Sequence, residues 1–264
     1  MEVAGSALIF SREPLDGALA AVRGLGFRAV ELAALEGWAH IAPSRVADDP
    51  AAETRRVAAA LTAADLRPVA VNAGLGTEDP DEGRRRARAL FEMAAALGVP
   101  VVTLPAPGGA AGLGAAAAQL RPLVEDAAYH GLTLAVETHM GAVTERPDAA
   151  ALLCGEVPGL RLTLDPSHYW AGPAQGRGWR ACIPFVAHVH LRDAGLGGWP
   201  QIQVWPGRGA VDFGAVHAAL REVRYEGARS VEYIDTLPVA AAEVGAGAAE
   251  AAAEMARQAG GWGA

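Results

Sequence analysis

The sequence has little of several features that would assign it to a specialised class of protein. Only two cysteines, Cys154 and Cys182, occur among its 264 residues, and they form no Cys-x-x-Cys motif. Two separate cysteines are typical of small buried side chains in a reducing compartment, so neither a disulfide framework nor a cysteine zinc site is expected. No Gly-x-Gly-x-x-Gly follows the first apolar run, which removes the usual signal of a dinucleotide-binding sheet.

Basic residues and long apolar runs are also scarce. Lysine and arginine number 22 against 30 acidic residues, which gives a net charge of −8. Binding to nucleic acid needs a basic surface, so no nucleic-acid partner is expected. The most apolar stretch, residues 99–120, is interrupted by Pro100, Pro105, Pro107 and glycines, so no membrane span is expected. The first residues lack the basic start and apolar core of a signal peptide, which predicts a cytoplasmic protein.

What the chain does have is a regular alternation of short apolar runs with alanine-rich amphipathic segments. The expected strands are Val3–Phe10, Phe27–Leu32, Pro68–Asn72, Val99–Leu104, Leu132–Glu137, Leu160–Asp165, Phe185–Leu191 and Ser230–Ile234. The expected helices are Ala18–Arg23, Ala51–Ala64, Asp81–Leu97, Ala111–His130, Asp148–Cys154, Trp179–Cys182, Phe213–Val223 and Val239–Gln258. Nearly continuous apolar strands separated by helices favour a parallel sheet buried on both faces. With no linker, this predicts an α/β fold, a (β/α)8 TIM barrel, as one domain over residues 1–264.

Four of these strands end in residues that can bind a divalent metal. The apolar runs lead to Glu137, to Asp165, to the pair His188 and His190, and to Glu232. In a parallel barrel the C-terminal ends of the strands converge on the face that holds the active site. Carboxylates with one imidazole suit Mn²⁺ best, with Mg²⁺, Co²⁺ or Zn²⁺ as alternatives. We therefore predict one divalent metal ion at this face.

Each residue of this set also has an ordinary structural interpretation. A single acid at a strand end is usually a solvated loop residue, and Asp165 begins an Asp-Pro-Ser sequence that is common in turns. His188 and His190 lie two residues apart on one strand and so point to the same face, but this spacing does not choose between them as ligands. The succession of four such strand ends is what favours a metal site.

Several segments carry a resemblance to a known family. They are Ala-Val-Glu137-Thr-His, Leu-Asp165-Pro-Ser-His168, His188-Val-His190-Leu-Arg-Asp193, Pro206-Gly-Arg-Gly-Ala-Val-Asp212-Phe and Val-Glu232, with Phe10 to Leu32 similar to a first βαβ unit. The chain resembles the sugar phosphate isomerase/epimerase family, part of the xylose-isomerase-like TIM-barrel superfamily. The resemblance implies that Glu137, Asp165, His190 and Glu232 bind one divalent metal. It also implies that His168 lies beside the metal and contacts the substrate.

The implied activity is a metal-dependent isomerase or epimerase that acts on a small carbohydrate through an enediolate. In this chemistry a proton next to the carbonyl is removed, and the metal stabilises the negative charge that develops. The resemblance implies that Glu137 and Glu232 are the bases and that His168 is a third catalytic residue. Many ketose 3-epimerases of the family carry a further Glu shortly after the first metal ligand. Here the sequence reads Thr-His139-Met and the next acid is Glu145, which weakens that specific assignment.

Substrate contacts are expected from His168, from His139 and from Arg208, in the loop after the seventh strand. No concentrated basic pocket stands out, which favours a neutral sugar or cyclitol over a sugar phosphate. Aromatic residues in predicted loops either shape this pocket, pack internally or form the interface of a homo-oligomer; they are Trp38, Tyr169, Trp170, Trp199 and Trp205. The run Arg84-Arg-Arg-Ala-Arg88 is interpreted as the exposed face of a helix.

Three other functions stay open. A dehydratase of an inosose or related keto-sugar would form the same enolate and then expel a β-hydroxyl with His168 as the acid. An apurinic/apyrimidinic endonuclease would need three metals, extra histidines on earlier strands and an Asp-x-His after the seventh, none of which the sequence offers. A barrel whose metal serves binding or structure alone is the third.

Overall fold

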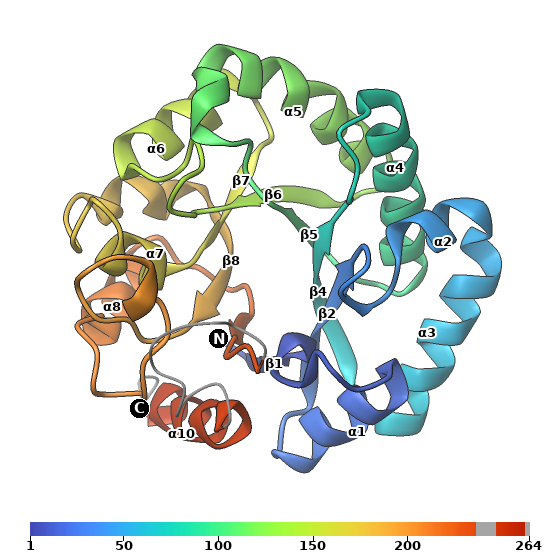
Figure 1. Cartoon of the computed structure of the whole chain (residues 1–264), viewed down its shortest axis with the longest axis horizontal. Coiled ribbons are helices and arrows are strands. Elements are labelled where there is room, and N and C mark those ends of the chain that lie inside the picture. Colours follow the sequence, from blue (N-terminus) through green and yellow to red (C-terminus); the bar gives the residue numbers. More distant parts are fainter. Residues whose placement is uncertain (236–246, 262–264) are drawn as a thin grey trace.

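The apolar runs form eight parallel strands that close into a ring in the computed structural model, which describes residues 1–235 and 247–261 (Figure 1). The ring strands are β1 (Val3–Ser6), β2 (Ala29–Leu35), β4 (Arg67–Gly74), β5 (Val101–Leu104), β6 (Thr133–Glu137), β7 (Arg161–Leu164), β8 (Val186–Leu191) and β9 (Arg229–Val231). β1 pairs with both β2 and β9, which closes the ring. A short β3 (Ala39–His40) pairs antiparallel with β2. The predicted (β/α)8 barrel is confirmed.

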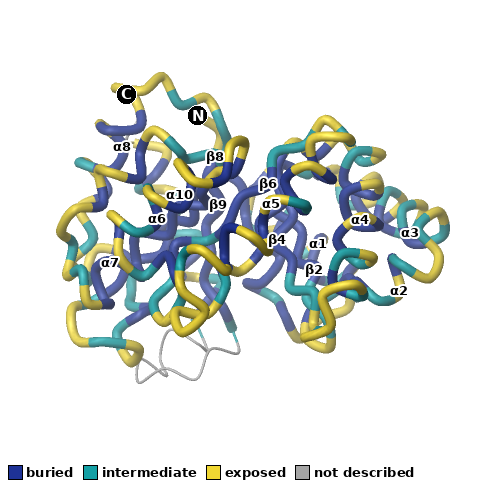
Figure 2. Tube along the Cα trace, turned by 90° about the horizontal axis from the view of Figure 1, so that it is seen from above, coloured by how far each residue is buried: buried dark blue, intermediate teal, exposed yellow. Residues whose placement is uncertain are grey.

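Helices surround this ring. They are α1 (Leu15–Gly24), α2 (Pro43–Asp48), α3 (Pro50–Ala64), α4 (Pro80–Ala96), α5 (Gly112–Tyr129), α6 (Pro147–Glu156), α7 (Pro166–Ala171), α8 (Phe213–Glu222) and α10 (Ala248–Gly261). Short 3-10 turns are η1 (Ala7–Phe10), η2 (Gly109–Ala111), η3 (Trp179–Phe185) and η4 (Trp199–Gln201). The strands are buried and the outward turns of the helices are exposed (Figure 2). Within the described residues, no helix combines the length and apolar character needed to cross a bilayer.

Local sequence explains where α4 begins and ends. The Asp79 side chain accepts hydrogen bonds from the backbone N–H groups of Asp81 and Glu82, and Pro80 occupies the first turn, where its missing N–H costs nothing. Beyond the last turn, Gly98 has a φ of +70°, a left-handed conformation that glycine adopts without strain. The apolar face between these ends packs into the core around Leu90.

Some expected boundaries were wrong. The first strand ends at Ser6 instead of Phe10, because the Ser6 side chain accepts a hydrogen bond from the Leu8 N–H and turns the chain into η1. The expected helix Trp179–Cys182 is the 3-10 turn η3, which contains Pro184. The expected helix Val239–Gln258 begins at Ala248 in the part that the structure describes, and residues 239–246 lie outside the described residues.

Polar side chains meet inside the ring. The hydroxyls of Thr103 on β5 and Thr163 on β7 lie 2.7 Å apart across a barrel in which these strands are not neighbours. Toward the C-terminal ends of the strands the buried polar residues are larger, and most are ionisable; they are Glu31, Asn72, Asp165, His168, His188, His190, Arg192 and Glu232. This end of the barrel holds the candidate site.

Candidate active site

The structure brings the four predicted metal ligands together. Glu137 ends β6, Asp165 follows β7, His190 lies on β8 and Glu232 follows β9. One ligand atom from each lies within 4.8 Å of the others. His190 Nδ1 lies 3.0 Å from Glu137 Oε1 and 3.5 Å from Glu232 Oε2, so the imidazole stands between the two glutamates.

Asp165 takes part both in the Asp-Pro-Ser turn and in the group of candidate metal ligands. Its Oδ1 accepts hydrogen bonds from the Ser167 N–H at 2.8 Å and from the Ser167 hydroxyl at 2.5 Å, and so caps the start of α7. Its Oδ2 accepts a hydrogen bond from Arg192 Nη2 at 2.5 Å. One oxygen therefore maintains the turn while the other faces the metal group.

Arg192 and Asn72 were missed as site residues by the sequence analysis. The Arg192 side chain is 3 % exposed, and its Nη1 lies 3.3 Å from Glu232 Oε2. Asn72, at the end of β4, donates to Glu232 Oε1 at 3.1 Å. Arg192 could have been found because it lies two residues after His190 and so shares its face of the strand. Asn72 could have been found as a polar residue that ends an apolar run.

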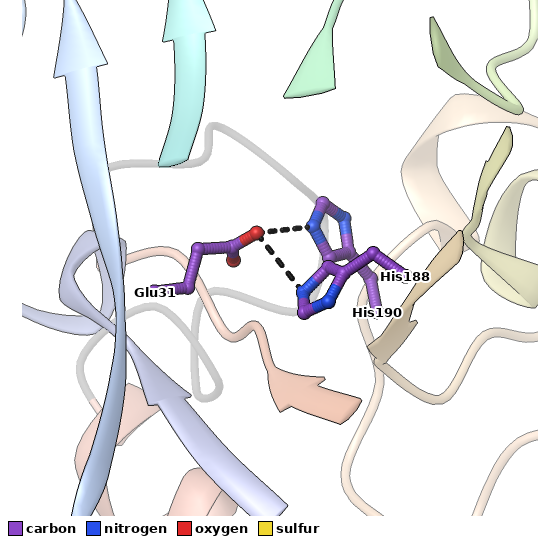
Figure 3. A group of neighbouring side chains, drawn as sticks. All are labelled: Glu31, His188 and His190. Atoms are coloured by element: carbon purple, nitrogen blue, oxygen red, sulfur yellow. Dashed lines mark hydrogen bonds and ion pairs between the residues drawn. The ribbon is translucent and has the colours of Figure 1, made fainter. Parts of the chain in front are cut away.

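Glu31 was also missed. It lies on β2, is fully buried, and its Oε1 lies 3.0 Å from His190 Nε2 and 3.2 Å from His188 Nε2 (Figure 3). His188 is thus outside the four-residue metal group and belongs to a second one with Glu31 and His190. Glu31 could have been found because it is an acid within an apolar run, Ala-Val-Glu31-Leu, which is the pattern that identified Glu137 as a site residue.

The pKa values of the titratable groups in the site are shifted in opposite directions. Burial, only partly offset by His190 and Arg192, raises the pKa of Glu232 to about 7. Burial also acts to raise the pKa of Glu137, but the hydrogen bond and charge of His190 more than offset it and lower that pKa. Burial alone would lower the pKa of His190, whereas Glu232 and Glu31 raise it well above its usual value. Burial and then Arg192 lower the pKa of His168 well below its usual range, so it is neutral at pH 7.

The charges in this group fit a divalent cation. The group contains four buried or nearly buried carboxylates, and their cationic partners are only Arg192 and His190; the four are Glu31, Glu137, Asp165 and Glu232. Buried carboxylates are stable only when they are paired or bind a metal. Three carboxylates and one imidazole within 4.8 Å form a donor set that suits Mn²⁺, Mg²⁺ or Zn²⁺.

A cavity of about 480 Å³ opens above this group. Its polar lining comprises Glu137, Glu232, His168, His139, Arg192 and Asn72, and Trp38 and Trp199 also line it. Arg208 is exposed and does not line this cavity; its N–H donates to the Trp205 carbonyl at 2.9 Å. Tyr169 and Trp170 are core residues instead.

His139 lies against His168 in the cavity wall, with the two ring centroids 3.8 Å apart. Arg192 Nη2 lies 3.2 Å from His168 Nε2, and because a guanidinium only donates, this nitrogen accepts. Glu145 does not reach the cavity, since it accepts a hydrogen bond from the Gly141 N–H at 2.8 Å. Besides Glu137 and Glu232, the polar lining of the described cavity therefore consists of two imidazoles, Arg192 and Asn72.

A family model described as xylose isomerase-like TIM barrel matches residues 19–259. The chain belongs to this family. A comparison with curated protein sequences finds no match. The resemblance in sequence to the xylose-isomerase-like superfamily is thereby confirmed.

Solved structures show the same fold at low sequence identity. The probable 3-DHS dehydratase AsbF from Bacillus anthracis is 17% identical, with a TM-score of 0.72 over 97% of this chain and 98% of that one. The 3-keto-D-glucoside 4-epimerase YcjR from E. coli is 18% identical, with a TM-score of 0.71 over 98% and 99%. A xylose isomerase-like TIM barrel protein from Mycobacterium smegmatis in complex with magnesium is 15% identical, with a TM-score of 0.72 over 97% of each chain.

Proposed function

We propose that the protein is a divalent-metal-dependent isomerase or epimerase that acts on a keto-sugar or cyclitol. The observation that carries this proposal is the position of Glu137 and Glu232. Both line the cavity, they come from strands separated in the ring by β7 and β8, and both face His190 Nδ1. Two carboxylates thus border the place where one substrate carbon would lie.

Glu137, Asp165, His190 and Glu232 would hold the metal, for which Mn²⁺ is the preferred ion. When bound, the cation would stabilise the negative charge that develops on the carbonyl and hydroxyl oxygens of the substrate as the proton is lost. Epimerases and a magnesium-bound barrel among the similar structures support this assignment.

The two glutamates would divide the proton transfers. One carboxylate removes the proton next to the carbonyl, and the other delivers a proton to the opposite face of the same carbon, which inverts it. Return of the proton to the neighbouring carbon by one carboxylate would interconvert an aldose and a ketose.

The side chains available exclude one other way to activate a carbonyl. All 22 basic residues of the chain are arginines, so no lysine of this chain can form a Schiff base with the substrate. Arg192 is the cation of the protein nearest to the metal ligands, and it is already engaged by Asp165 and Glu232. Because it is also the only arginine that lines the described cavity, a neutral sugar or cyclitol is the preferred substrate.

The dehydratase alternative requires His168 to donate a proton to a leaving hydroxyl. The low pKa of His168, caused by burial and then by Arg192, makes it neutral and therefore a poor acid. The epimerase and isomerase chemistry needs no such donor, which is why we prefer it, although the similar structure AsbF is named as a probable dehydratase.

Proton NMR of keto-sugars and inososes, incubated in D₂O with metal-replete protein, tests the proposal. Exchange of hydrogen at one carbon next to the carbonyl, with formation of an epimer or an aldose, is the expected result. Loss of water with a new enone or diketone signal would instead assign a dehydratase. A metal-replete protein that changes none of these compounds would contradict the proposal and favour a non-catalytic barrel.

A further inference from the structure

A second polar cluster adjoins the metal ligands inside the barrel. Glu31 on β2 faces His188 and His190 on β8 across the ring, and all three side chains are at most 1 % exposed (Figure 3). His190 belongs to both clusters: its Nε2 lies 3.0 Å from Glu31 Oε1, and its Nδ1 lies 3.0 Å from Glu137 Oε1. The two ring nitrogens therefore point to different carboxylates.

The chemistry of a carboxylate decides which nitrogen carries a hydrogen. An ionised glutamate can only accept, so a hydrogen bond to Glu31 requires the hydrogen on His190 Nε2. In a neutral imidazole the lone pair then lies on Nδ1, which faces Glu137 and Glu232. Glu31 thus favours the tautomer that can bind a cation among those glutamates.

The surroundings hold Glu31 in this role. Its Oε1 is shared by His188 and His190, whereas its Oε2 is buried without a hydrogen-bond partner among the described residues. His188 Nε2 also lies 2.9 Å from the Ser230 hydroxyl on β9, which fixes the imidazole beside Glu31.

We propose that Glu31 is a positioning residue, which fixes His190 as an Nδ1 ligand of the metal and increases the affinity of the site. This inference rests on the metal site of the proposed function. The same three residues could alternatively hold a second cation. His190 Nε2 cannot both donate to Glu31 and bind that cation, so the number of bound metals separates the two arrangements.

Zinc binding and ¹⁵N NMR of histidine-labelled protein test the proposal without an assay of activity. The variants are Glu31→Leu, which removes the acceptor, and Glu31→Gln, whose carbonyl can still accept from His190 Nε2–H. The matched control is Glu53→Gln, because Glu53 is also buried but pairs with Arg45 and Arg56 away from the site. We expect the zinc affinity to fall by about 10–100-fold in Glu31→Leu and by less in Glu31→Gln, and to stay unchanged in the control.

The NMR spectrum reports the tautomer directly. In the zinc-loaded wild type, His190 should carry its hydrogen on Nε2 and give a slowly exchanging resonance, which Glu31→Leu should lose. If the Leu variant does not fold, the Gln variant carries the test, with its smaller loss of affinity and a shifted Nε2–H resonance.

The outcomes separate failure of the positioning role from failure of the metal site. Wild-type protein that binds no zinc would overturn the metal site itself and the inference with it. One zinc per chain with equal affinity in wild type and both variants would overturn the role of Glu31 and leave the metal site standing. Two zinc ions in wild type, reduced to one in Glu31→Leu, would replace the positioning role with a second metal site.

Discussion

Two ion clusters of this barrel differ in how their charges balance. On the outer wall, the Asp126 carboxylate on α5 accepts hydrogen bonds from Arg84 Nε at 2.6 Å and from Arg88 Nη2 at 2.9 Å, both on α4. These arginines are 40 % and 59 % exposed. At the barrel mouth, Arg192, which is 3 % exposed, pairs with Asp165 and Glu232, while Glu137 and Glu31 contact His190. The carboxylate of the outer cluster has two partly exposed guanidiniums as partners, whereas the inner cluster has more carboxylates than cationic partners and is almost fully buried.

This difference indicates which of the two clusters requires a cation that the protein itself does not supply. The Asp126 carboxylate is 8 % exposed and is satisfied by two partly exposed guanidiniums, and an ion pair of this kind contributes modestly to stability. Several carboxylates in a buried site repel one another and lack water, so they either take up protons or bind a cation. The raised pKa of Glu232, caused mainly by burial, is the mark of that imbalance, and the metal we propose would relieve it.

The strongest test of the contrast is the change Asp165→Ala. Wild-type protein should hold about one divalent ion per chain, and the variant should lose most of it together with measurable turnover, because a ligand and the partner of Arg192 are removed. Elemental analysis after dialysis measures the metal, and Asp126→Asn is the matched control that should retain it. Full occupancy in Asp165→Ala would contradict the ligand set, and about three metals per wild-type chain would favour the endonuclease.

A smaller but more specific effect is expected from Glu→Gln at positions 137 and 232. Each variant keeps an oxygen for the metal but loses a base, so turnover should fall by about 10²–10⁴ while metal is largely retained. In Glu232→Gln the new amide can turn toward Asn72, whose own amide can flip to accept.

The two glutamine variants also distinguish an epimerase from an isomerase. An epimerase that lacks one base should still exchange the proton with D₂O from the other face, without inversion. In an isomerase, one of the two changes should be far more harmful than the other. Near-normal turnover in both variants with metal bound would show that neither glutamate is the base.

The smallest effect is expected at the outer cluster. Asp126→Asn should lower the free energy of unfolding by about 1 kcal/mol, because its arginine partners can turn to water, and should leave turnover unchanged. The hydrogen bond from Arg84 is the main cause of the lowered pKa of Asp126. The stabilisation is therefore present above the pKa of an unfolded aspartate, about 4, and is lost as the pH falls through the lower pKa of the folded protein.

Urea unfolding of wild type and Asp126→Asn at pH 7 and at pH 3 measures this effect. The difference in free energy should shrink at the lower pH. If turnover in this variant fell as far as in Glu232→Gln, the outer cluster would also be needed for activity, which would contradict the difference that we draw between the wall and the mouth of the barrel.

Local patterns in the sequence predicted the barrel and the strand ends at which Glu137, Asp165 and Glu232 lie, whereas the choice of His190 over His188 came from the family resemblance. Continuous apolar runs determine strands that are buried on both faces, and the end of such a run places Glu137 or Glu232 at the mouth. The same local reasoning was incomplete for the arginine run, where Arg84 and Arg88 share Asp126 from α5 rather than facing only solvent.

Only the tertiary structure decided which polar groups meet across the ring. Glu31 and His190 are 159 residues apart, and their contact depends on how the strands close and on the register between them. Sequence spacing predicted that His188 and His190 on β8 and Arg192 just beyond its end share one face, because side chains alternate along an extended chain. It could not choose their partners, since that choice is made by strands far away in the chain that the closed barrel brings within 3–4 Å of them.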